Sequence, residues 1–259
     1  MNRFFRLLVC VLALLLCGTA WAQKLKFGYS DVESELYQLG NSNQIASPPG
    51  VAVDLLNQVA KELGLEFEYV RLPVRRVWDS LQNGELVGAF MYSFKDERTQ
   101  FGVFPMKDGR DNAALRMTSL SYVFYKAKGS PFNWDGKNFT GLDGGTIGFN
   151  TTYSIGADLD KRGIKTEEAR TTDQNFKKLT AGRIAAYAMQ EHTGDLYLAV
   201  NKITDVEKVA TPPYESKPYY LMLSKQFVQK DPALADKVWN TLAKVREEKL
   251  QTLLRKYQQ

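Results

Sequence analysis

Cysteine is scarce in this 259-residue chain, and its distribution excludes several kinds of chemistry. The two cysteines, Cys10 and Cys17, both lie in the first 22 residues. That stretch has arginines near its start, an unbroken apolar run over 7–16 and a small-x-small sequence just before Gln23. This pattern predicts a secretory signal over 1–22 that is removed. The processed chain would then contain no disulfide, no thiolate nucleophile and no cysteine metal site.

Histidine, long apolar runs and blocks of charge are also in short supply. His192 is the only histidine, so the sequence excludes a His-rich metal site, and we expect no metal. No segment after the signal approaches the roughly 20 apolar residues of a membrane span. The formal net charge is +5, and the basic residues are spread along the chain, so nucleic acid is not an expected partner. The sequence fingerprints of phosphate loops and dinucleotide-binding sites are absent, and we therefore expect no cofactor.

The stretch 66–104 is the most informative part of what is present. It contains a predicted strand over 66–72, an amphipathic helix over 73–84 and an apolar strand over 87–92. A strand–helix–strand unit of this length forms a parallel pair, and ligands bind beyond the carboxyl ends of such strands. Ser93 and Arg98 follow such an end directly. We therefore expect this loop to hold the anionic end of a small ligand.

Strands and helices alternate along the rest of the chain, which predicts an α/β protein with mostly parallel sheets. A polar loop over 30–49 is long enough to suggest a functional role. Breaks near 117–121 and 210–213 indicate two crossings between lobes, with lobe I at 23–119 plus 214–259 and lobe II at 120–213. The other predicted strands are 24–29, 121–127, 146–149, 184–189, 206–210 and 219–223, and the other helices are 52–63, 152–161, 176–182 and one that begins after Asp231.

Several motifs resemble those of the bacterial extracellular solute-binding proteins of the polar amino acid type, family 3. They are Gly50-Val51-Ala52-Val53-Asp54-Leu55-Leu56, Leu81-x-x-Gly84, Glu97-Arg98, Ala127-Lys128-Gly129-Ser130-Pro131 and Leu179-Thr180-Ala181-Gly182-Arg183. The resemblance implies a type II periplasmic-binding-protein fold, in which two lobes joined by a two-crossing hinge close on a ligand. It also implies a monomer that serves the membrane permease of an ABC transporter.

The resemblance further implies roles for particular residues. The family's arginine that matches Arg98 pairs with the α-carboxylate of the ligand, assisted by the hydroxyl that matches Ser93 and the helix start that matches Thr151 and Thr152. A guanidinium suits this role because it pairs with a carboxylate in a bidentate manner. The family's aspartate for the ligand ammonium is replaced here by Gln190. Glu191 follows it and is a candidate to hold a ligand ammonium, although a carboxylate at a helix start is the simpler explanation. The sequence therefore favours recognition of an anion over that of an ammonium.

Other candidates have simpler structural explanations beside the functional one. Arg98 alone would be a solvated surface charge, and Thr151 and Thr152 an N-cap. Arg75 begins a helix, where cations are unfavourable, so it is a candidate for a second ligand anion, although a solvated helix face is the commoner reason. Tyr92 and Tyr153 are candidate stacking partners, although most aromatic residues belong to the core.

These observations predict a periplasmic solute-binding protein, not an enzyme, that captures a small carboxylate-bearing polar solute such as an amino acid or an analogue. Two alternatives stay open. One is an exported cyclohexadienyl-dehydratase-like enzyme on the same fold, in which Glu191 acts as general acid or base. The other is a sensory module that reports the ligand state to a membrane kinase.

Overall fold

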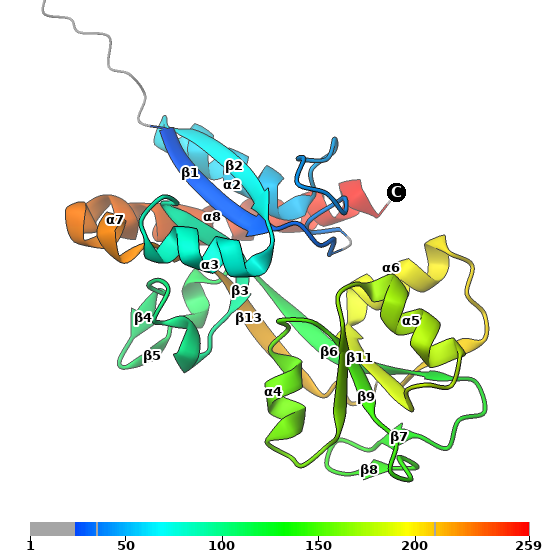
Figure 1. Ribbon diagram of the computed structural model, residues 1–259. Coiled ribbons are helices and arrows are strands. Elements are labelled where there is room, and N and C mark those ends of the chain that lie inside the picture. Colours follow the sequence, from blue (N-terminus) through cyan, green and yellow to red (C-terminus); the bar gives the residue numbers. More distant parts are fainter. Residues whose placement is uncertain (1–23, 35, 210, 259) are drawn as a thin grey trace, which may run out of the picture.

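The computed structural model describes residues 24–34, 36–209 and 211–258. The predicted signal over 1–22 lies outside the described residues. The fold consists of two lobes, each a sheet with flanking helices, joined by the long strands β6 (Thr118–Ala127) and β13 (Glu215–Leu223) (Figure 1). Within the described ranges, no helix has the length and apolar character that crossing a membrane requires.

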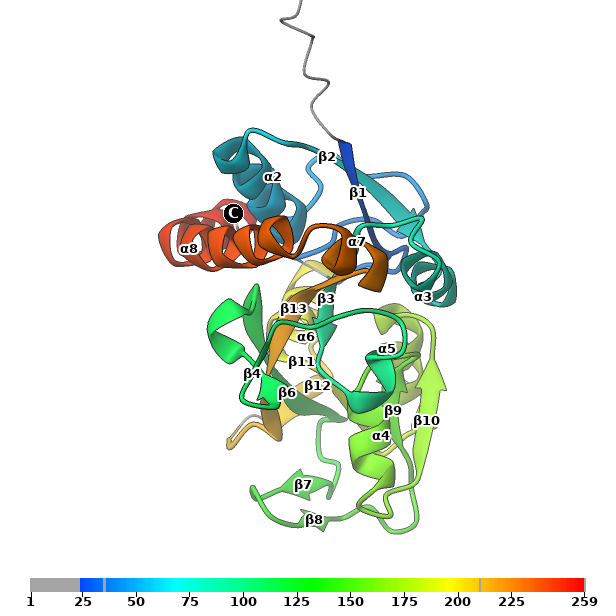
Figure 2. The same cartoon turned by 90° about the vertical axis from the view of Figure 1, so that its left-hand side faces the viewer.

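The first lobe is built on three parallel strands. β1 lies between β2 and β3 and pairs in parallel with both, as a sheet made of strand–helix–strand units should. The helices α2 and α8 lie together against this sheet (Figures 1 and 2). Its elements are β1 (Lys24–Ser30), α2 (Val51–Leu63), β2 (Glu66–Leu72), α3 (Val74–Gln82), β3 (Gly88–Ser93), the short 3-10 helices η1 (Asp96–Arg98) and η2 (Ala113–Leu115), the hairpin β4 (Met106–Lys107) and β5 (Arg110–Asp111), α7 (Lys225–Lys230) and α8 (Pro232–Tyr257).

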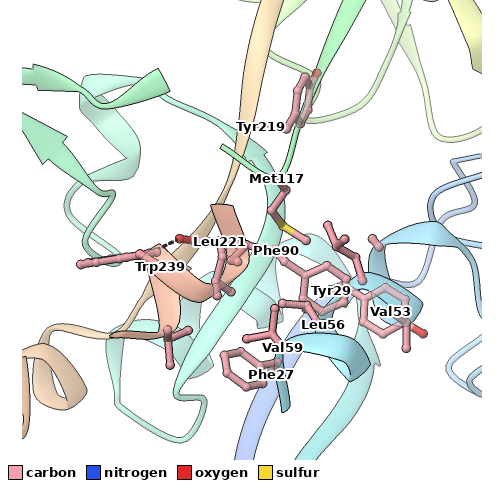
Figure 3. Packing of buried hydrophobic residues seen from close by; sticks show 14 of the residues in the cluster. Phe27, Tyr29, Val53, Leu56, Val59, Phe90, Met117, Tyr219, Leu221 and Trp239 are labelled. Atoms are coloured by element: carbon pink, nitrogen blue, oxygen red, sulfur yellow. Dashed lines mark hydrogen bonds between the residues drawn. The ribbon is translucent and has the colours of Figure 1, made fainter. Parts of the chain in front are cut away.

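One apolar cluster holds α2 and α8 against the strands (Figure 3). The apolar stripe of α2 buries Leu56 and Val59 against Phe27 and Phe90 of the sheet, all with no exposed surface. Each such side chain contributes about 1.5–3 kcal/mol by leaving water. α8 is fixed in addition by Trp239, whose indole N–H donates to the carbonyl oxygen of Leu221 at 2.9 Å. The ends of β1 and β3 are therefore rigidly placed.

The second lobe has a smaller sheet around β9. β9 pairs in parallel with β10 and β11, and β6 adds antiparallel pairs with β11 and β12. Aromatic rings around Phe124 fill its core. Its elements are β7 (Asn133–Trp134), β8 (Phe139–Thr140), β9 (Ile147–Asn150), α4 (Ile155–Asp160), β10 (Thr166–Ala169), α5 (Thr172–Thr180), β11 (Ala186–Gln190), α6 (Glu191–Val200) and β12 (Val206–Val209).

The two linking strands lie side by side between the lobes. Thr118–Tyr122 of β6 pairs in antiparallel fashion with Glu215–Tyr219 of β13, and the rest of β13 continues along β3. The proline pair at 212–213, where the sequence predicts the second crossing, directly precedes β13. These antiparallel pairs join the two lobes in one nine-stranded sheet.

Candidate functional site

A cavity lies between the lobes, at the carboxyl ends of β1, β3 and β11. This is the place where open α/β sheets bind ligands. The first lobe contributes Ser30, Val32, Ser34, Gln38, Val74, Met91, Tyr92, Ser93 and Arg98, the linking strands contribute Tyr122 and Tyr219, and the second lobe contributes Thr151, Thr152, Tyr153, Ser154 and Gln190. Seven of the nine site residues predicted from the sequence line it.

Arg98 lies at the point where the loop after β3 meets the second lobe. Its Nη1 donates to the carbonyl oxygen and the hydroxyl of Ser93 at 2.7 and 3.0 Å, and its Nη2 donates to the carbonyl oxygen of Thr152 at 3.1 Å. The guanidinium carbon is 5.8 Å from the ring centre of Trp78 and 5.9 Å from that of Tyr92. These partners are all neutral, and none of the ion pairs among the described residues includes Arg98.

The end of β3 is irregular where it meets the cavity. The pairing of β3 with β13 shifts register, so that Tyr92 faces Tyr220 and Phe90 faces Leu221, with Met91 as the extra residue. Met91 has φ 66°, a left-handed backbone that a side chain other than glycine seldom adopts. A bulge redirects the side chains that follow it. Here it brings Met91, Tyr92 and Ser93 in turn to the cavity wall.

The loop over 30–49 forms another wall and is fastened to β2 by one buried arginine. Arg71 is only 2 % exposed, and its guanidinium donates to the carbonyl oxygens of Ser30 at 3.3 Å and Leu39 at 2.6 Å and to that of Gly40. Three backbone oxygens, one from the start of the loop and two from its middle, therefore meet at a single cation. This contact anchors the loop beside the cavity, where Ser34 and Gln38 line the wall.

The second lobe contributes a turn where the sequence predicted a helix start. Thr152 has φ 70°, which no α-helix can use, and α4 begins only at Ile155. The prediction of a helix over 152–161 with Thr151 or Thr152 as its N-cap is therefore wrong at its beginning. The turn nevertheless brings the carbonyl oxygen of Thr152 to Arg98 and the hydroxyl of Ser154 to that of Ser93, at 3.2 Å.

A chain of neutral polar side chains runs along the back of the cavity. Ser34 donates from its hydroxyl to Oε1 of Gln190 at 3.3 Å, and Nε2 of Gln190 donates to the hydroxyl of Tyr219 at 2.8 Å. The hydroxyls of Tyr219 and Tyr122 are 2.9 Å apart. Burial raises the pKa of Tyr219 to about 12 and also raises the pKa of Tyr122 well above its usual value. Both phenols are therefore protonated and uncharged at neutral pH.

The hydroxyl of Tyr92 differs from these. It is buried and has no hydrogen-bond partner among the described residues. Burial also raises the pKa of Tyr92, so it too is neutral.

An ion cluster lies behind Ser154 and joins the lobes. Asp158 of α4 pairs with Lys95, from the loop after β3, and with Lys217 of β13. Lys217 is 5 % exposed and also donates to the hydroxyl of Ser154 at 3.1 Å. Burial acts to raise the pKa of Asp158, but the hydrogen bonds and charges of Lys217 and Lys95 outweigh it and lower that pKa below its usual value.

Two residues predicted for the site are not among those that line the cavity. Arg75 is exposed on α3, and its neighbour Val74 lines the cavity instead. Glu191 begins α6 and pairs with Lys208 at 2.8 Å. It therefore offers the dehydratase-like alternative no carboxylate in this cavity. Groups of three or more His, Asp or Glu that might hold a metal ion are also absent from the described residues.

Several of the lining residues could not be selected from the sequence. Tyr122 and Tyr219 look like ordinary strand residues, since only the pairing of distant strands brings them to the cavity. For Ser34 and Gln38 the sequence contains one indication of a functional role, the length of the loop that carries them.

Comparisons with known proteins agree with this architecture. The sequence matches the model of the bacterial extracellular solute-binding proteins, family 3, over residues 31–259. No curated protein matches it. Among solved structures, the arginine-, lysine-, histidine-binding protein ArtJ of Geobacillus stearothermophilus is similar with a TM-score of 0.70 and 21 % identity, over 91 % of this chain and 95 % of that one.

Two further structures extend the range of similar proteins. The GluR0 ligand-binding core from Nostoc punctiforme in complex with L-glutamate has a TM-score of 0.70 and 16 % identity, over 90 % of this chain and 98 % of its own. A histidine kinase sensor domain has a TM-score of 0.71 and 17 % identity, over 91 % of this chain and 96 % of its own. At these identities the similarity concerns the fold.

Proposed function

Because the chain belongs to family 3 of the bacterial extracellular solute-binding proteins, we propose that it captures a small carboxylate-bearing polar solute, an amino acid or an analogue, between its lobes. The observation that carries the proposal is the place of Arg98. Its guanidinium faces the cavity, contacts both lobes and has only neutral partners. A carboxylate is the group that a planar guanidinium binds most specifically.

The mechanism that this geometry supports is capture followed by closure. A carboxylate that enters the open cleft pairs with Arg98. It accepts the hydrogen bond that Nη2 of Arg98 now donates to the carbonyl oxygen of Thr152. Both lobes then contact the solute, so binding favours the closed state over the open one. Closure removes water, which strengthens the ion pair. The lobes in this proposal are 23–119 plus 214–259 and 120–213, with the hinge in β6 and β13.

The proposal includes no catalysis, and it places the processed protein in the periplasm as a monomer that delivers solute to the membrane permease of an ABC transporter. The similar histidine kinase sensor domain supports one alternative, a role in sensing. Crosslinking in cells followed by purification distinguishes the two: recovery of a permease supports transport, and recovery of a membrane kinase supports sensing.

A binding assay tests the capture itself. The processed protein is titrated calorimetrically with amino acids, hydroxy acids and dicarboxylates, and any solute that co-purifies is identified by mass spectrometry. Arg98→Ala should weaken binding of the best carboxylate by about 2–5 kcal/mol, which is at least about 30-fold. Arg75→Ala is the matched control, since Arg75 is an exposed arginine outside the cavity, and it should leave the affinity unchanged. Equal affinity of Arg98→Ala and the wild-type protein would contradict the proposal.

A further inference from the structure

The charge balance of the interlobe cavity narrows the class of solute. We infer that the solute is a small carboxylate whose second polar group is a neutral hydroxyl or carbonyl, as in a hydroxy acid or keto acid, and not an ammonium. The inference rests on the proposed function, because it concerns the same cavity and the same arginine.

The cavity wall has one charged side chain. Of the residues that line it, Arg98 alone carries a charge, and the others are serine, threonine, tyrosine, glutamine, valine and methionine. One guanidinium satisfies one carboxylate of the solute. A zwitterion would also need an anionic partner for its ammonium, and the wall provides none.

Three carboxylates near the cavity are neutralised by cations of the chain. Asp158 pairs with both Lys95 and Lys217. Asp31, which directly follows the lining residue Ser30, pairs with Arg170 at 3.0 Å, and Glu191, which directly follows Gln190, pairs with Lys208 at 2.8 Å. A solute ammonium could recruit one of these three only by breaking an ion pair that already exists. A fourth carboxylate, that of Glu33, is not itself a lining residue and accepts from the backbone N–H of Gly40 at 2.9 Å and from Nδ2 of Asn41 at 3.0 Å.

The ion cluster behind the wall adds no free carboxylate. Lys95 and Lys217 are balanced there by Asp158 and Glu215, and Lys217 donates directly to the lining hydroxyl of Ser154. The charge of Arg98 at the wall therefore attracts an anion and repels a cation. Since the cavity has a low dielectric constant when the lobes are closed, this repulsion is screened less than it would be in water.

Gln190 ends β11 and presents a neutral amide at the cavity wall. Its amide is held from both sides, by the hydroxyls of Ser34 and Tyr219, and it is 4 % exposed. The phenol of Tyr92 adds a buried hydroxyl without a partner among the described residues. Amides and phenols donate to and accept from a hydroxyl, and donate to a carbonyl, without a net charge.

Pairs of acids that differ only in carrying a hydroxyl or an ammonium next to the carboxylate provide the test. The processed wild-type protein is titrated calorimetrically at pH 7 with L-lactate and L-alanine, L-glycerate and L-serine, L-malate and L-aspartate, and L-phenyllactate and L-phenylalanine. In the pair that binds best, the hydroxy acid should bind at least about tenfold more tightly, because the buried ammonium would lack an anionic partner. If the amino acid binds more tightly, the inference is overturned while the proposed function stands. If no acid of any pair binds, both are overturned.

Two substitutions at one position test the cause of the selectivity. Gln190→Glu adds a carboxylate at the wall and should shift the ratio of affinities toward the amino acid by at least about tenfold. Gln190→Met has a similar size but no carboxylate; loss of the amide should weaken binding of both acids, without the shift toward the amino acid that Gln190→Glu produces. Circular dichroism checks that each variant is folded. A folded Gln190→Glu variant with the selectivity of the wild-type protein would overturn the assignment of the selectivity to the charge of the wall.

Discussion

Asp158 carries more of the contact between the lobes than any other single carboxylate. It accepts hydrogen bonds from Lys95 and Lys217, which come from different segments of the first lobe and the hinge, while its own helix belongs to the second lobe. Its side chain is 17 % exposed. Removing its charge leaves Lys217 buried, with Glu215 as its one remaining ion-pair partner, at 3.1 Å.

We expect Asp158→Asn to lower the free energy of unfolding by about 2 kcal/mol at pH 7, or the melting temperature by about 4–8 °C. The pKa of Asp158 in the folded protein lies below its ordinary value of 3.8. A lowered pKa stabilises the fold above the unfolded value and loses this contribution as the pH falls through the folded value. The difference from wild type should thus be constant between pH 7 and 5 and shrink below pH 4.

Asp160→Asn is the matched control for this prediction. Asp160 lies on the same helix, is exposed and accepts a hydrogen bond from the hydroxyl of Thr166 at 2.8 Å, a contact that asparagine can also make. Its melting temperature should stay near that of wild type at every pH. A difference between Asp158→Asn and wild type that does not shrink at all as the pH falls below 4 would show that the charge is not its source.

At the scale of elements, α6 packs so closely on β6 that residue 194 has no room for a side chain. A Cβ at Gly194 would lie 2.4 Å from ring atoms of Tyr125. That ring cannot move away easily, because Tyr125 has no exposed surface and its hydroxyl donates to the carbonyl oxygen of Glu191 and to Oδ1 of Asp195, each at 2.9 Å. The start of α6, directly after Gln190, is positioned by this contact.

Gly194→Ala should therefore destabilise the protein by about 1–3 kcal/mol, although alanine favours a helix over glycine by about 1 kcal/mol. Urea unfolding followed by circular dichroism measures the change. His192→Ala is the control, since His192 is exposed on the same helix, and it should change the stability by less than about 0.5 kcal/mol. A Gly194→Ala variant as stable as wild type would mean that α6 is free to move away from β6.

Elements with a strong local pattern could be predicted from the sequence. The helix expected over 52–63 is α2, Val51–Leu63, because its apolar residues form one continuous stripe. The terminal helix begins as expected, with Asp231 accepting from the backbone N–H of Leu234 at 2.9 Å. By contrast α7, the strand β10 and the two small hairpins were not predicted, since they are short and their residues show no period.

The site was predictable to the extent that it depends on strand ends. Ser93 ends β3, Arg98 follows it and Gln190 ends β11, so their placement at the cavity follows from the parallel sheet. Arg75 illustrates the limit: it is one residue from Val74, and one residue is about 100° of turn on a helix. Which of the two faces the cavity depends on how α3 packs, and that is a tertiary property. The bulge at Met91 has no signature in the sequence either.

At the scale of the whole molecule, polar contacts join the lobes at several points, beside an apolar contact of Leu196 of α6 with the core of the first lobe. The polar contacts are individually weak and sensitive to salt, which suits a hinge that must open and close. They join Arg98 to Thr152, Ser93 to Ser154, Lys95 to Asp158, Asp31 to Arg170, and Ser34 to Gln190.

Spin labels can measure this closure, because the chain from Gln23 onward has no cysteine of its own. With labels at Arg76→Cys on α3 and Lys177→Cys on α5, the solute-free protein should include a population at the short distance of the described structure. Lys95→Ala combined with Arg170→Ala removes two ion pairs between the lobes, together worth about 1 kcal/mol, and should reduce that population about fivefold relative to the open one. Lys24→Ala is the control, since Lys24 pairs with Glu66 inside the first lobe at 2.9 Å. Equal distance distributions in the double variant and the control would mean that the hinge strands β6 and β13, and not the ion pairs, set the angle between the lobes.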